Sequence, residues 1–416
     1  MKTVTAEILT IGDEILYGQI VDTNSQWMGT ELSKAGIRVV RITTIGDNSK
    51  DILQAFAEAE TRADLILITG GLGPTSDDLT KPCLAQYFNC EMKIHEEALA
   101  EVTAFFSSRG RVLTEINRMQ ALLPICCEKI TNRLGTAPGM WFGRDGKVFV
   151  SMPGVPHEMK AMMTEIIIPK LTKSFKTPAI RHTVIRTVGI GESFLADKIS
   201  DWEKSLPPHI KLAYLPGYGE VRLRLTATGT DADSLVKESA LLVEEIRPLA
   251  GDYIYGLGDE TLEVVIGKTL REKKLSLALA ESCTGGHLAH TMTSVPGSSD
   301  YFRGSIVAYA NEVKVDTLGV RKETIETYGA VSEQTVLEMA AQVRQKLNSD
   351  IGVATSGIAG PGGATPDKPV GLVWIAYADG QQHIARQLKL SQDRIINIKL
   401  TSVNVLNLIR ICLKNR

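Results

Sequence analysis

The sequence predicts an α/β protein with two α/β domains, each built on a parallel or mixed sheet, joined by a small α+β module. Three observations lead to this prediction. In residues 1–169, and again in residues 260–416, short apolar runs that end in glycine-rich loops alternate with amphipathic helical segments, a pattern typical of sheets covered by helices. Residues 170–255 instead combine alternating strand patterns with two helical segments, as expected for an α+β fold.

The composition narrows the class of protein. The chain has 416 residues, 44% hydrophobic and 23% charged, with a formal net charge of −2, which is ordinary for a soluble protein of two to four domains. No overall basic field attracts nucleic acid. The first residues run into a strand pattern without a signal-peptide core, and no apolar run is long enough to span a bilayer. We therefore expect a cytoplasmic protein without membrane contacts.

The cysteines form no C-x-x-C pair, and adjacent Cys126 and Cys127 are poorly placed to bridge each other. We therefore expect reduced thiols and no structural zinc. The six cysteines are Cys83, Cys90, Cys126, Cys127, Cys283 and Cys412.

The first domain alternates strands with helices in chain order. Strands are expected over residues 4–12, 37–45, 63–69 and 148–151, and helices over residues 22–32 and 51–62. Such an order predicts a parallel sheet with helices on both faces, and ligands bind such sheets beyond the carboxyl ends of the strands. Asp13, Glu14, Asp47 and the loop at residues 70–78 all fall at these ends, which indicates one polar site.

The most informative loop follows the strand at residues 63–69 and has the sequence Thr69-Gly-Gly-Leu-Gly-Pro-Thr-Ser-Asp-Asp-Leu-Thr80. Its glycines allow close approach of the backbone to a ligand, and its amides, ahead of a helix start, favour a phosphate. Two aspartates beside a phosphate would repel it unless a divalent cation lay between them. The alternative is a plain glycine-rich turn with an aspartate helix cap. The expected ligand-binding residues are Gly70, Gly71, Gly73 and Thr75, and the expected metal ligands are Glu14, Asp77 and Asp78, with Asp78 also catalytic.

In the last domain, a strand over residues 275–280 ends in Glu281-Ser-Cys-Thr-Gly-Gly286, and a helix is expected from near His287. A serine at a strand end, followed by glycines and a helix start, has the mechanics of a nucleophile turn. Amides around Thr284, Gly285 and Gly286 would hold an oxyanion or a phosphate. The stretch is not a G-x-S-x-G elbow, and a serine helix cap is the alternative.

Two further stretches follow strands of the same domain. Tyr309-Ala-Asn-Glu-Val-Lys314 places a lysine one turn into a helix, where burial would lower its pKa and let it act as a base. The loop Thr355-Ser-Gly-Ile-Ala-Gly-Pro-Gly-Gly363 offers a second phosphate cradle, or is a plain glycine-rich loop. Its candidate binding residues are Gly357, Gly360 and Gly362. Cys283 is a rival nucleophile, because thiolates are intrinsically stronger.

Several motifs of the first domain resemble the competence/damage-inducible protein A (CinA) family. They are Gly12-Asp-Glu-Ile-Leu16, the loop Thr69–Thr80, Asn132-Arg-Leu-Gly-Thr-Ala-Pro-Gly139 and Met152-Pro-Gly-Val-Pro-His-Glu-Met159. In that family the amino-terminal domain is similar to the molybdopterin-binding fold of molybdenum-cofactor biosynthesis proteins. The resemblance implies ADP-ribose pyrophosphatase activity with a divalent metal cation (Mg, Mn or Co).

Family members carry a small KH-like domain at the position of residues 170–255. A KH nucleic-acid site needs a G-x-x-G loop flanked by basic residues, and neither Gly189-Ile-Gly-Glu192 nor Gly217-Tyr-Gly-Glu220 fits. We therefore expect a structural spacer rather than an RNA-binding module, with residues 251–259 as the linker into the last domain.

The three stretches of the last domain resemble the nicotinamide mononucleotide deamidase (PncC) domain of the same family, over about residues 260–412. The resemblance implies an amidohydrolase without a cofactor that converts nicotinamide mononucleotide to nicotinate mononucleotide and ammonia. The matching serine is Ser282, and the matching lysine and tyrosine are Lys314 and Tyr309.

The resulting hypothesis is a bifunctional hydrolase of pyridine-nucleotide salvage, expected to be a homodimer. Its small-molecule partners would be nicotinamide mononucleotide and ADP-ribose, which would be cleaved to AMP and ribose 5-phosphate. Two rivals remain open. In the first, the amino-terminal domain binds a molybdopterin-type ligand. In the second, the chain is a non-catalytic nucleotide-binding competence adaptor.

Overall fold

The structure is a computed structural model that describes residues 4–75, 77–175 and 177–414. The chain forms two compact units, Met1–Arg181 with Ala227–Val236, and His182–Thr226 with Lys237–Arg416. The fold class is the predicted one, because two mixed α/β sheets and a four-stranded α+β module follow each other along the chain. Each is described by itself.

The first domain is built on a six-stranded sheet with the order β2-β1-β3-β8-β7-β6. The first four strands in this order are parallel, and β7 and β6 are antiparallel, which makes the sheet mixed. A separate antiparallel pair, β4 and β5, stands beside it. The strands are β1 (Thr5–Ile11), β2 (Arg38–Ile45), β3 (Leu65–Thr69), β4 (Met92–Ile94), β5 (Leu122–Pro124), β6 (Glu128–Ile130), β7 (Gly139–Arg144) and β8 (Lys147–Met152).

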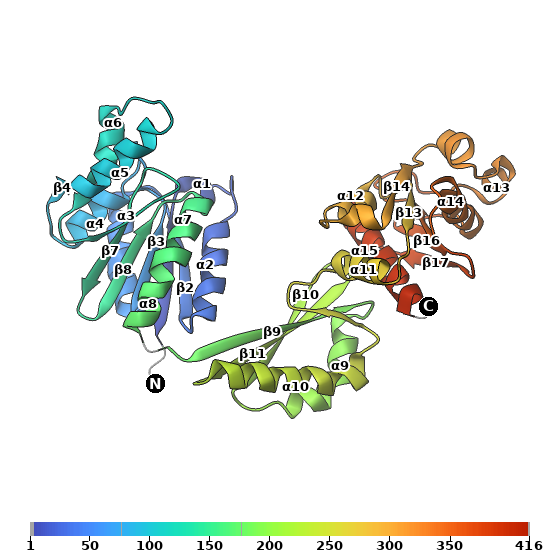
Figure 1. Cartoon of the computed structure of the whole chain (residues 1–416), viewed down its shortest axis with the longest axis horizontal. Coiled ribbons are helices and arrows are strands. Elements are labelled where there is room, and N and C mark those ends of the chain that lie inside the picture. Colours follow the sequence, from blue (N-terminus) through green and yellow to red (C-terminus); the bar gives the residue numbers. More distant parts are fainter. Residues whose placement is uncertain (1–3, 76, 176, 415–416) are drawn as a thin grey trace. The chain divides into compact units, whose positions relative to one another are not determined.

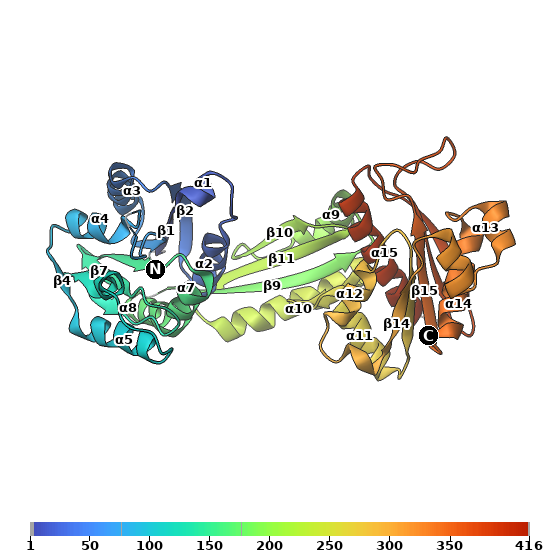
Figure 2. The same cartoon turned by 90° about the horizontal axis from the view of Figure 1, so that it is seen from above.

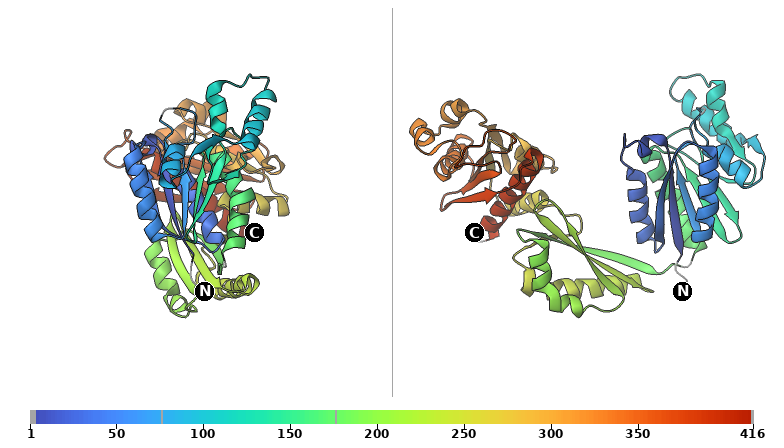
Figure 3. Two further views of the ribbon diagram at one scale, coloured as in Figure 1. Left: turned by 90° about the vertical axis from the view of Figure 1, so that its left-hand side faces the viewer. Right: turned by 180° about the vertical axis from the view of Figure 1, so that it is seen from behind.

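Helices cover both faces of this sheet, and the right panel of Figure 3 shows the strands standing between them. One core joins the sheet to α3, α4 and α5, and the other joins it to α2, α7 and α8. The strand β3 is buried along its whole length, as its continuous apolar sequence predicts. The helical elements are α1 (Asp13–Leu16), α2 (Thr23–Lys34), α3 (Ser49–Arg62), α4 (Thr80–Tyr87), α5 (Glu96–Ser107), α6 (Glu115–Arg118), η1 (Met119–Ala121), α7 (Pro156–Met162), η2 (Met163–Ile167) and α8 (Ile168–Ser174).

A disulfide joins Cys90 and Cys126, whose Cα atoms are 6.2 Å apart. The expectation of reduced thiols is wrong for this pair. The reason is the antiparallel pairing of β4 with β5, which sets Met92 opposite Pro124 and so brings together the residues two positions beyond them. Because 36 residues separate the two cysteines along the chain, the sequence alone gives no sign of their proximity.

The middle module is a sheet with the order β10-β11-β9-β12, and α9 and α10 lie against it (Figure 2). Residues 251–259, expected to be a linker, contain the strand β12, so that expectation is wrong. The short apolar run from Ile254 to Leu257 pairs antiparallel with β9, with Ile254 opposite Thr187. The elements are β9 (Ala179–Val188), α9 (Glu192–Lys204), β10 (Ile210–Pro216), β11 (Glu220–Gly229), α10 (Ala232–Ala250) and β12 (Ile254–Leu257).

The last domain has a five-stranded sheet with the order β14-β13-β15-β16-β17. The strands β14, β13 and β15 are parallel, and β16 and β17 are antiparallel. One core joins the sheet to α11, α12 and α15, and α14 covers the other face (Figure 1). The elements are α11 (Leu262–Glu272), β13 (Leu277–Glu281), α12 (His287–Thr293), η3 (Ser298–Asp300), β14 (Phe302–Val307), η4 (Val313–Leu318), α13 (Lys322–Tyr328), α14 (Glu333–Lys346), β15 (Ile351–Gly357), β16 (Leu372–Ala378), β17 (His383–Lys389) and α15 (Arg394–Lys414).

The helix α15 corrects one expectation. With 21 residues, it is long and apolar enough to cross a membrane by length and composition, whereas the sequence was expected to hold no such run. Half of its most apolar window is buried inside the protein, where residues such as Val405 and Leu408 join the core of the last domain. A core helix of a soluble protein passes the same test.

Candidate functional sites

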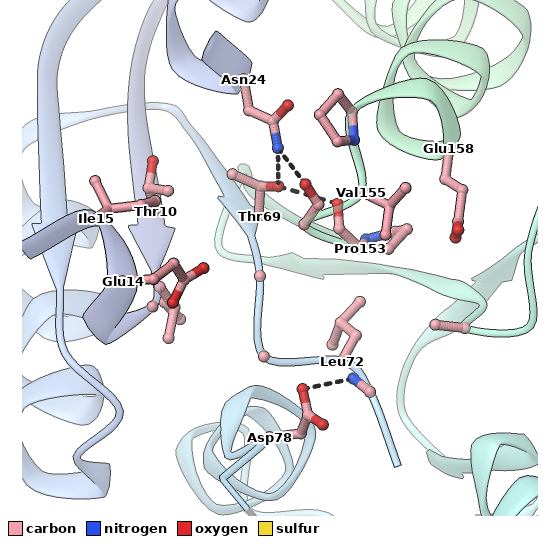
Figure 4. A pocket seen from close by; sticks show the side chains of 18 of the residues that line it. Thr10, Glu14, Ile15, Asn24, Thr69, Leu72, Asp78, Pro153, Val155 and Glu158 are labelled. Carbon is pink, nitrogen blue, oxygen red and sulfur yellow. Dashed lines mark hydrogen bonds between the residues drawn. The ribbon is translucent and has the colours of Figure 1, made fainter. Parts of the chain in front are cut away.

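The first candidate site is a cavity of about 490 Å³ at the carboxyl ends of the parallel strands of the first domain (Figure 4). Its wall includes Gly70, Gly71 and Gly73 after β3, Glu14 after β1, and Asp47 after β2. The residues that the sequence analysis placed at the strand ends therefore do come together. Two exceptions are Thr75, which is exposed, and Asp13, since neither lines the cavity.

The glycines of this loop are required by its backbone. Gly70 has φ +106°, and a Cβ there would lie 2.1 Å from the carbonyl oxygen of Ile11. Gly71 has φ +62°, and a Cβ there would meet the hydroxyl of Thr80. That hydroxyl donates to the carbonyl oxygen of Gly70 at 2.9 Å. The turn is thus packed directly against β1 and the start of α4, which only residues without a Cβ allow.

Asp78 clamps the loop. Its Oδ1 accepts the Gly73 amide at 2.7 Å, and its Oδ2 accepts the Thr75 amide at 2.9 Å and the Thr75 hydroxyl. Both oxygens are therefore engaged by the chain, and the role of Asp78 as a catalytic metal ligand stays a prediction. Its neighbour Asp77 is exposed and lines the cavity, and a hydrogen bond from the Thr75 side chain lowers the pKa of its carboxyl group.

The cavity is strongly acidic. Among its described lining residues no side chain is basic, and the six acidic ones are Glu14, Asp22, Asp47, Asp77, Asp78 and Glu158. Asp13 and Asp47 bind each other's amides, at 3.1 and 3.3 Å. Burial, followed by the carboxylates of Asp13, Glu14 and Asp77, raises the pKa of Asp47. A phosphorylated ligand would enter this cavity only together with cations.

A hard divalent cation fits this donor set, because carboxylate oxygens are its preferred ligands. No three His, Cys, Asp or Glu side chains within the described parts of the chain converge on one point as a ready-made metal centre. Mg²⁺ is ordinarily held by one or two carboxylates together with substrate phosphates. Glu14, Asp47 and Asp77 are the carboxylates left for that role.

Sequence reasoning missed two buried polar residues at this site. Asn24 donates to the carbonyl oxygen of Gly154 at 2.7 Å and to the Thr69 hydroxyl at 3.3 Å, which ties the ends of β3 and β8 together (Figure 4). Lys81, only 6% exposed, donates to the carbonyl oxygen of Gln120 at 2.9 Å. Burial lowers the pKa of Lys81 to about 8. Neither position belongs to a strand-end loop, which was the signal used.

The second candidate site is a cavity of about 230 Å³ in the last domain. Ser282, at the carboxyl end of β13, and Lys314 both line it, and the Lys314 Nζ lies 3.1 Å from the Ser282 Oγ. The two side chains are 8% and 2% exposed, respectively. The predicted serine–lysine pair is therefore in direct contact.

Hydrogen bonds to two backbone carbonyl groups orient the Lys314 amine toward Ser282. Its Nζ donates to the carbonyl oxygens of Ala308 at 2.9 Å and Tyr309 at 3.1 Å. A neutral amine has two N–H bonds and one lone pair, and these two carbonyls use the N–H bonds. In the structure the third position of Nζ donates to the Ser282 Oγ. When the amine is neutral, that position carries the lone pair that can accept the hydroxyl proton. Burial lowers the pKa of Lys314, and the residue lies in the π-helix η4, a form often found at functional sites.

Cys283 also lines this cavity but is poorly suited to attack. Burial raises the pKa of its thiol to about 12, so the thiol stays protonated at neutral pH. A protonated thiol is not the nucleophilic form. The chemistry of the pair therefore favours Ser282.

Tyr309 and Arg394 form the outer wall of this cavity. The Tyr309 hydroxyl accepts from the Arg394 Nη2 at 2.9 Å, and the Arg394 Nη1 donates to the carbonyl oxygen of Gly360 at 2.8 Å. Tyr309 contacts Lys314 through its backbone carbonyl group, while its side chain lines the same cavity as Ser282, so a catalytic role of Tyr309 stays a prediction. Arg394 was missed, since it lies 80 residues beyond Lys314 in the sequence.

The predicted oxyanion donors are partly used by the protein itself. Glu281 is fully buried, and its carboxylate accepts the amides of Gly286, Leu288 and Ala289 at 3.0, 3.1 and 2.8 Å. The Gly285 amide donates to the Ser282 carbonyl oxygen at 3.1 Å. The amides of Gly285 and Gly286 are therefore not free for a ligand, which corrects that expectation. A carboxylate at a helix start is a strong partner for its free amides.

Only some of the remaining predicted binding residues line the cavity. Gly357 lines the cavity, and Gly360 faces Arg394 through its carbonyl group rather than its amide. Gly362 is exposed and lies outside the lining. Thr284 is 3% exposed and hydrogen-bonds the Thr355 hydroxyl at 2.8 Å, so its side chain supports β15 instead of facing a ligand. Whether the second glycine-rich loop holds a phosphate stays a prediction.

Comparisons with known proteins place three family models along the chain. They are a probable molybdopterin binding domain over residues 7–173, a damage-inducible protein CinA KH domain over residues 182–256, and a CinA C-terminal domain over residues 259–413. A CinA-like protein of Cytophaga hutchinsonii is 50% identical over 98% of each chain, and one of Flavobacterium psychrophilum is 47% identical over 94% of each. A crystal structure of CinA from Thermoplasma acidophilum, described as of unknown function, is 35% identical with a TM-score of 0.38, and the match covers 41% of this chain and 99% of that one.

Proposed function

The chain belongs to the CinA family, and on that premise we propose that its last domain is an amidohydrolase acting on nicotinamide mononucleotide. The observation that carries the proposal is the contact of 3.1 Å between Lys314 Nζ and Ser282 Oγ. Two carbonyl groups orient the amine toward the hydroxyl, and burial lowers its pKa. A serine with a neutral lysine as its base is a known variant of the catalytic triad.

The reaction follows from these positions. Lys314 takes the Ser282 hydroxyl proton as Oγ attacks the carboxamide carbon of the substrate. The amides of Cys283 and Thr284, next to Ser282, remain to stabilise the oxyanion. Collapse of the tetrahedral intermediate breaks the C–N bond, and Lys314 returns the proton to the leaving ammonia. Water, deprotonated by Lys314, then hydrolyses the ester to nicotinate mononucleotide and restores the serine.

Arg394 is the residue that we assign to the phosphate of this substrate. Among the described lining residues it is the one basic side chain besides Lys314, and it stands on the exposed side of the cavity. Its contacts with Tyr309 and Gly360 hold the guanidinium group in place. An arginine suits this task because its planar guanidinium group matches the geometry of a phosphate.

For the first domain we propose hydrolysis of the pyrophosphate bond of ADP-ribose to AMP and ribose 5-phosphate. Gly71 and Leu72 line the cavity, and their amides are left for a phosphate because the Gly70, Gly73 and Thr75 amides already have acceptors in the chain. The acidic cavity requires a cation before a pyrophosphate can enter. Glu14, Asp47 and Asp77 would hold that divalent cation (Mg, Mn or Co). When bound, it would polarise a phosphoryl oxygen and lower the pKa of a water molecule.

One assay tests both activities and their rivals. Purified full-length protein is incubated with nicotinamide mononucleotide or ADP-ribose, with Mg²⁺ or with excess chelator, and the products are separated by chromatography. We expect amide hydrolysis in both conditions and ADP-ribose cleavage only with the metal. Full ADP-ribose turnover in chelator would refute the role of the metal.

The two rival hypotheses are distinguished by measuring binding of the same nucleotides, and of molybdopterin, to the purified protein beside this assay. Binding of both nucleotides without any product would indicate a non-catalytic adaptor. Binding of molybdopterin, with ADP-ribose left intact, would indicate a molybdopterin-binding first domain. The molybdopterin hypothesis rests on the fold that molybdopterin-binding domains share with the first domain. The acidic cavity disfavours any anionic ligand that is not accompanied by a cation.

A further inference from the structure

We propose that a second cavity in the unit that holds the last domain, between β12, α11 and α15, is a binding site for a small organic carboxylate with an apolar body. This cavity has a volume of about 340 Å³, which falls within the usual range for small-molecule pockets. It is distinct from the Ser282 site, with which it shares no lining residue. The residues that line it are Ile254, Tyr255, Val265, Ile266, Thr269, Lys273, Arg410, Leu413 and Lys414.

The cavity combines apolar walls with basic ends. Apolar side chains reach it from all three elements, with Ile254 on β12, Val265 on α11 and Leu413 on α15. Three basic residues line it, namely Lys273, Arg410 and Lys414, and no acidic side chain lines it within residues 177–414. An apolar pocket with a few convergent polar groups is the usual form of a small-molecule site.

Arg410 is the central cation. Its Nε and Nη2 donate to the Asn407 Oδ1 at 3.1 and 2.9 Å, and Nη2 also donates to the Asp252 carbonyl oxygen at 2.8 Å. These partners are neutral, and they hold one edge of the guanidinium group. The other nitrogen, Nη1, has no partner within the described residues 177–414. Burial lowers the pKa of Arg410, as expected for a cation that lacks a directly bound carboxylate.

The other two cations differ in their partners. Lys414 donates to the Asp252 carboxylate at 2.8 Å, so its charge is paired. Lys273 is exposed and forms no ion pair with any residue that the structure describes. Arg410 and Lys273 together therefore leave an excess of positive charge at the cavity, which favours an anionic ligand.

The ligand class follows from the balance of charge and surface. A carboxylate can accept from the free Arg410 nitrogen and be attracted by Lys273, while its hydrocarbon part contacts Ile254, Val265 and Leu413. A free phosphate would bring a higher charge and more acceptors than this wall satisfies, and it would leave the apolar wall uncovered. Tyr255 turns its hydroxyl away to Glu220, at 2.9 Å, so its ring adds to the apolar surface.

The experiment measures binding of benzoate, as a probe, to the full-length protein by isothermal titration calorimetry, with inorganic phosphate as the competing probe. Val265→Phe fills the cavity, and Val264→Phe is its matched control, because Val264 is the adjacent residue of α11, is exposed and does not line the cavity. Lys273→Ala removes the unpaired charge, and Lys268→Ala, on the exposed side of the same helix, is its control.

We expect saturable benzoate binding to the wild type and to both controls. Lys273→Ala should weaken it about five- to tenfold, and Val265→Phe should abolish it while the protein still unfolds in one cooperative thermal transition. The proposal is overturned if benzoate does not bind, if Val265→Phe binds it as well as Val264→Phe does, or if phosphate binds more tightly than benzoate. If Val265→Phe does not fold, the smaller change Val265→Leu, which should weaken binding at least threefold, decides.

Discussion

At the scale of single residues, the account depends on where protons reside. Lys314 contacts Ser282 and two carbonyl groups in a buried setting that lowers its pKa. Cys283, the adjacent residue, has a raised pKa and stays a thiol. The same environment therefore makes the lysine a better base and the cysteine a poorer nucleophile, since burial disfavours the charged form of each.

The pH dependence of amide hydrolysis tests the state of Lys314. Only the neutral amine accepts a proton, so the rate constant should fall as pH drops through the lowered lysine pKa and level off above it. We expect this fall below pH 10.4, the ordinary value for lysine. Lys314→Arg keeps a cation that does not lose its proton, and it should be inactive across the range. A flat wild-type profile from neutral to mildly acidic pH would contradict a lysine base.

At the scale of elements, much of the architecture follows from the sequence. The apolar run before Thr69 gives a fully buried strand, and after it Gly70 and Gly71 have positive φ, with Gly70 against β1 and Gly71 against the start of α4. The sequence could not predict which backbone amides remain free to bind a ligand, because nearby side chains can fold back and accept their hydrogen bonds. Asp78 occupies the amides of the first loop, and Glu281 those of the helix start after Ser282. Periodicity indicates where a strand ends but not where a carboxylate points.

A pair of substitutions in the first loop separates metal binding from loop structure. Asp78→Asn replaces the acceptor that clamps Gly73 and Thr75, so it should lower the thermal unfolding temperature of the domain as well as its ADP-ribose turnover. Asp77→Asn removes an exposed carboxylate whose partner is the Thr75 side chain rather than the two amides that Asp78 holds, so it should weaken the activation by Mg²⁺ and lower the unfolding temperature less than Asp78→Asn does. Equal effects of both changes on stability would contradict this division of roles.

At the scale of the whole molecule, two polar sites of different chemistry lie on one chain. The first is an acidic cavity at strand ends, and the second is a compact serine–lysine pair. The strand β12 and the disulfide escaped prediction because both depend on pairing between segments far apart in the sequence. The helix expected over residues 22–32 begins at Thr23, with Asp22 as its cap.

Two fragments test how far the last domain stands alone. Its core includes Val188 and Tyr255 from the middle module, and burying such side chains contributes roughly 1.5–3 kcal/mol each. We therefore expect a fragment of residues 182–416 to unfold at a higher temperature than one of residues 260–416. The check is thermal unfolding followed by circular dichroism. Equal unfolding temperatures would contradict the contribution of the middle module.

The most direct test of the central claim is the steady-state rate constant for nicotinamide mononucleotide deamidation in two neighbouring variants. Ser282→Ala should lower kcat by at least about 10³-fold with little change in KM, because the nucleophile is lost and the phosphate contacts remain. Cys283→Ala should stay within about tenfold of the wild type. If Cys283→Ala abolishes turnover and Ser282→Ala preserves it, the serine–lysine account is wrong and the domain is a thiol hydrolase.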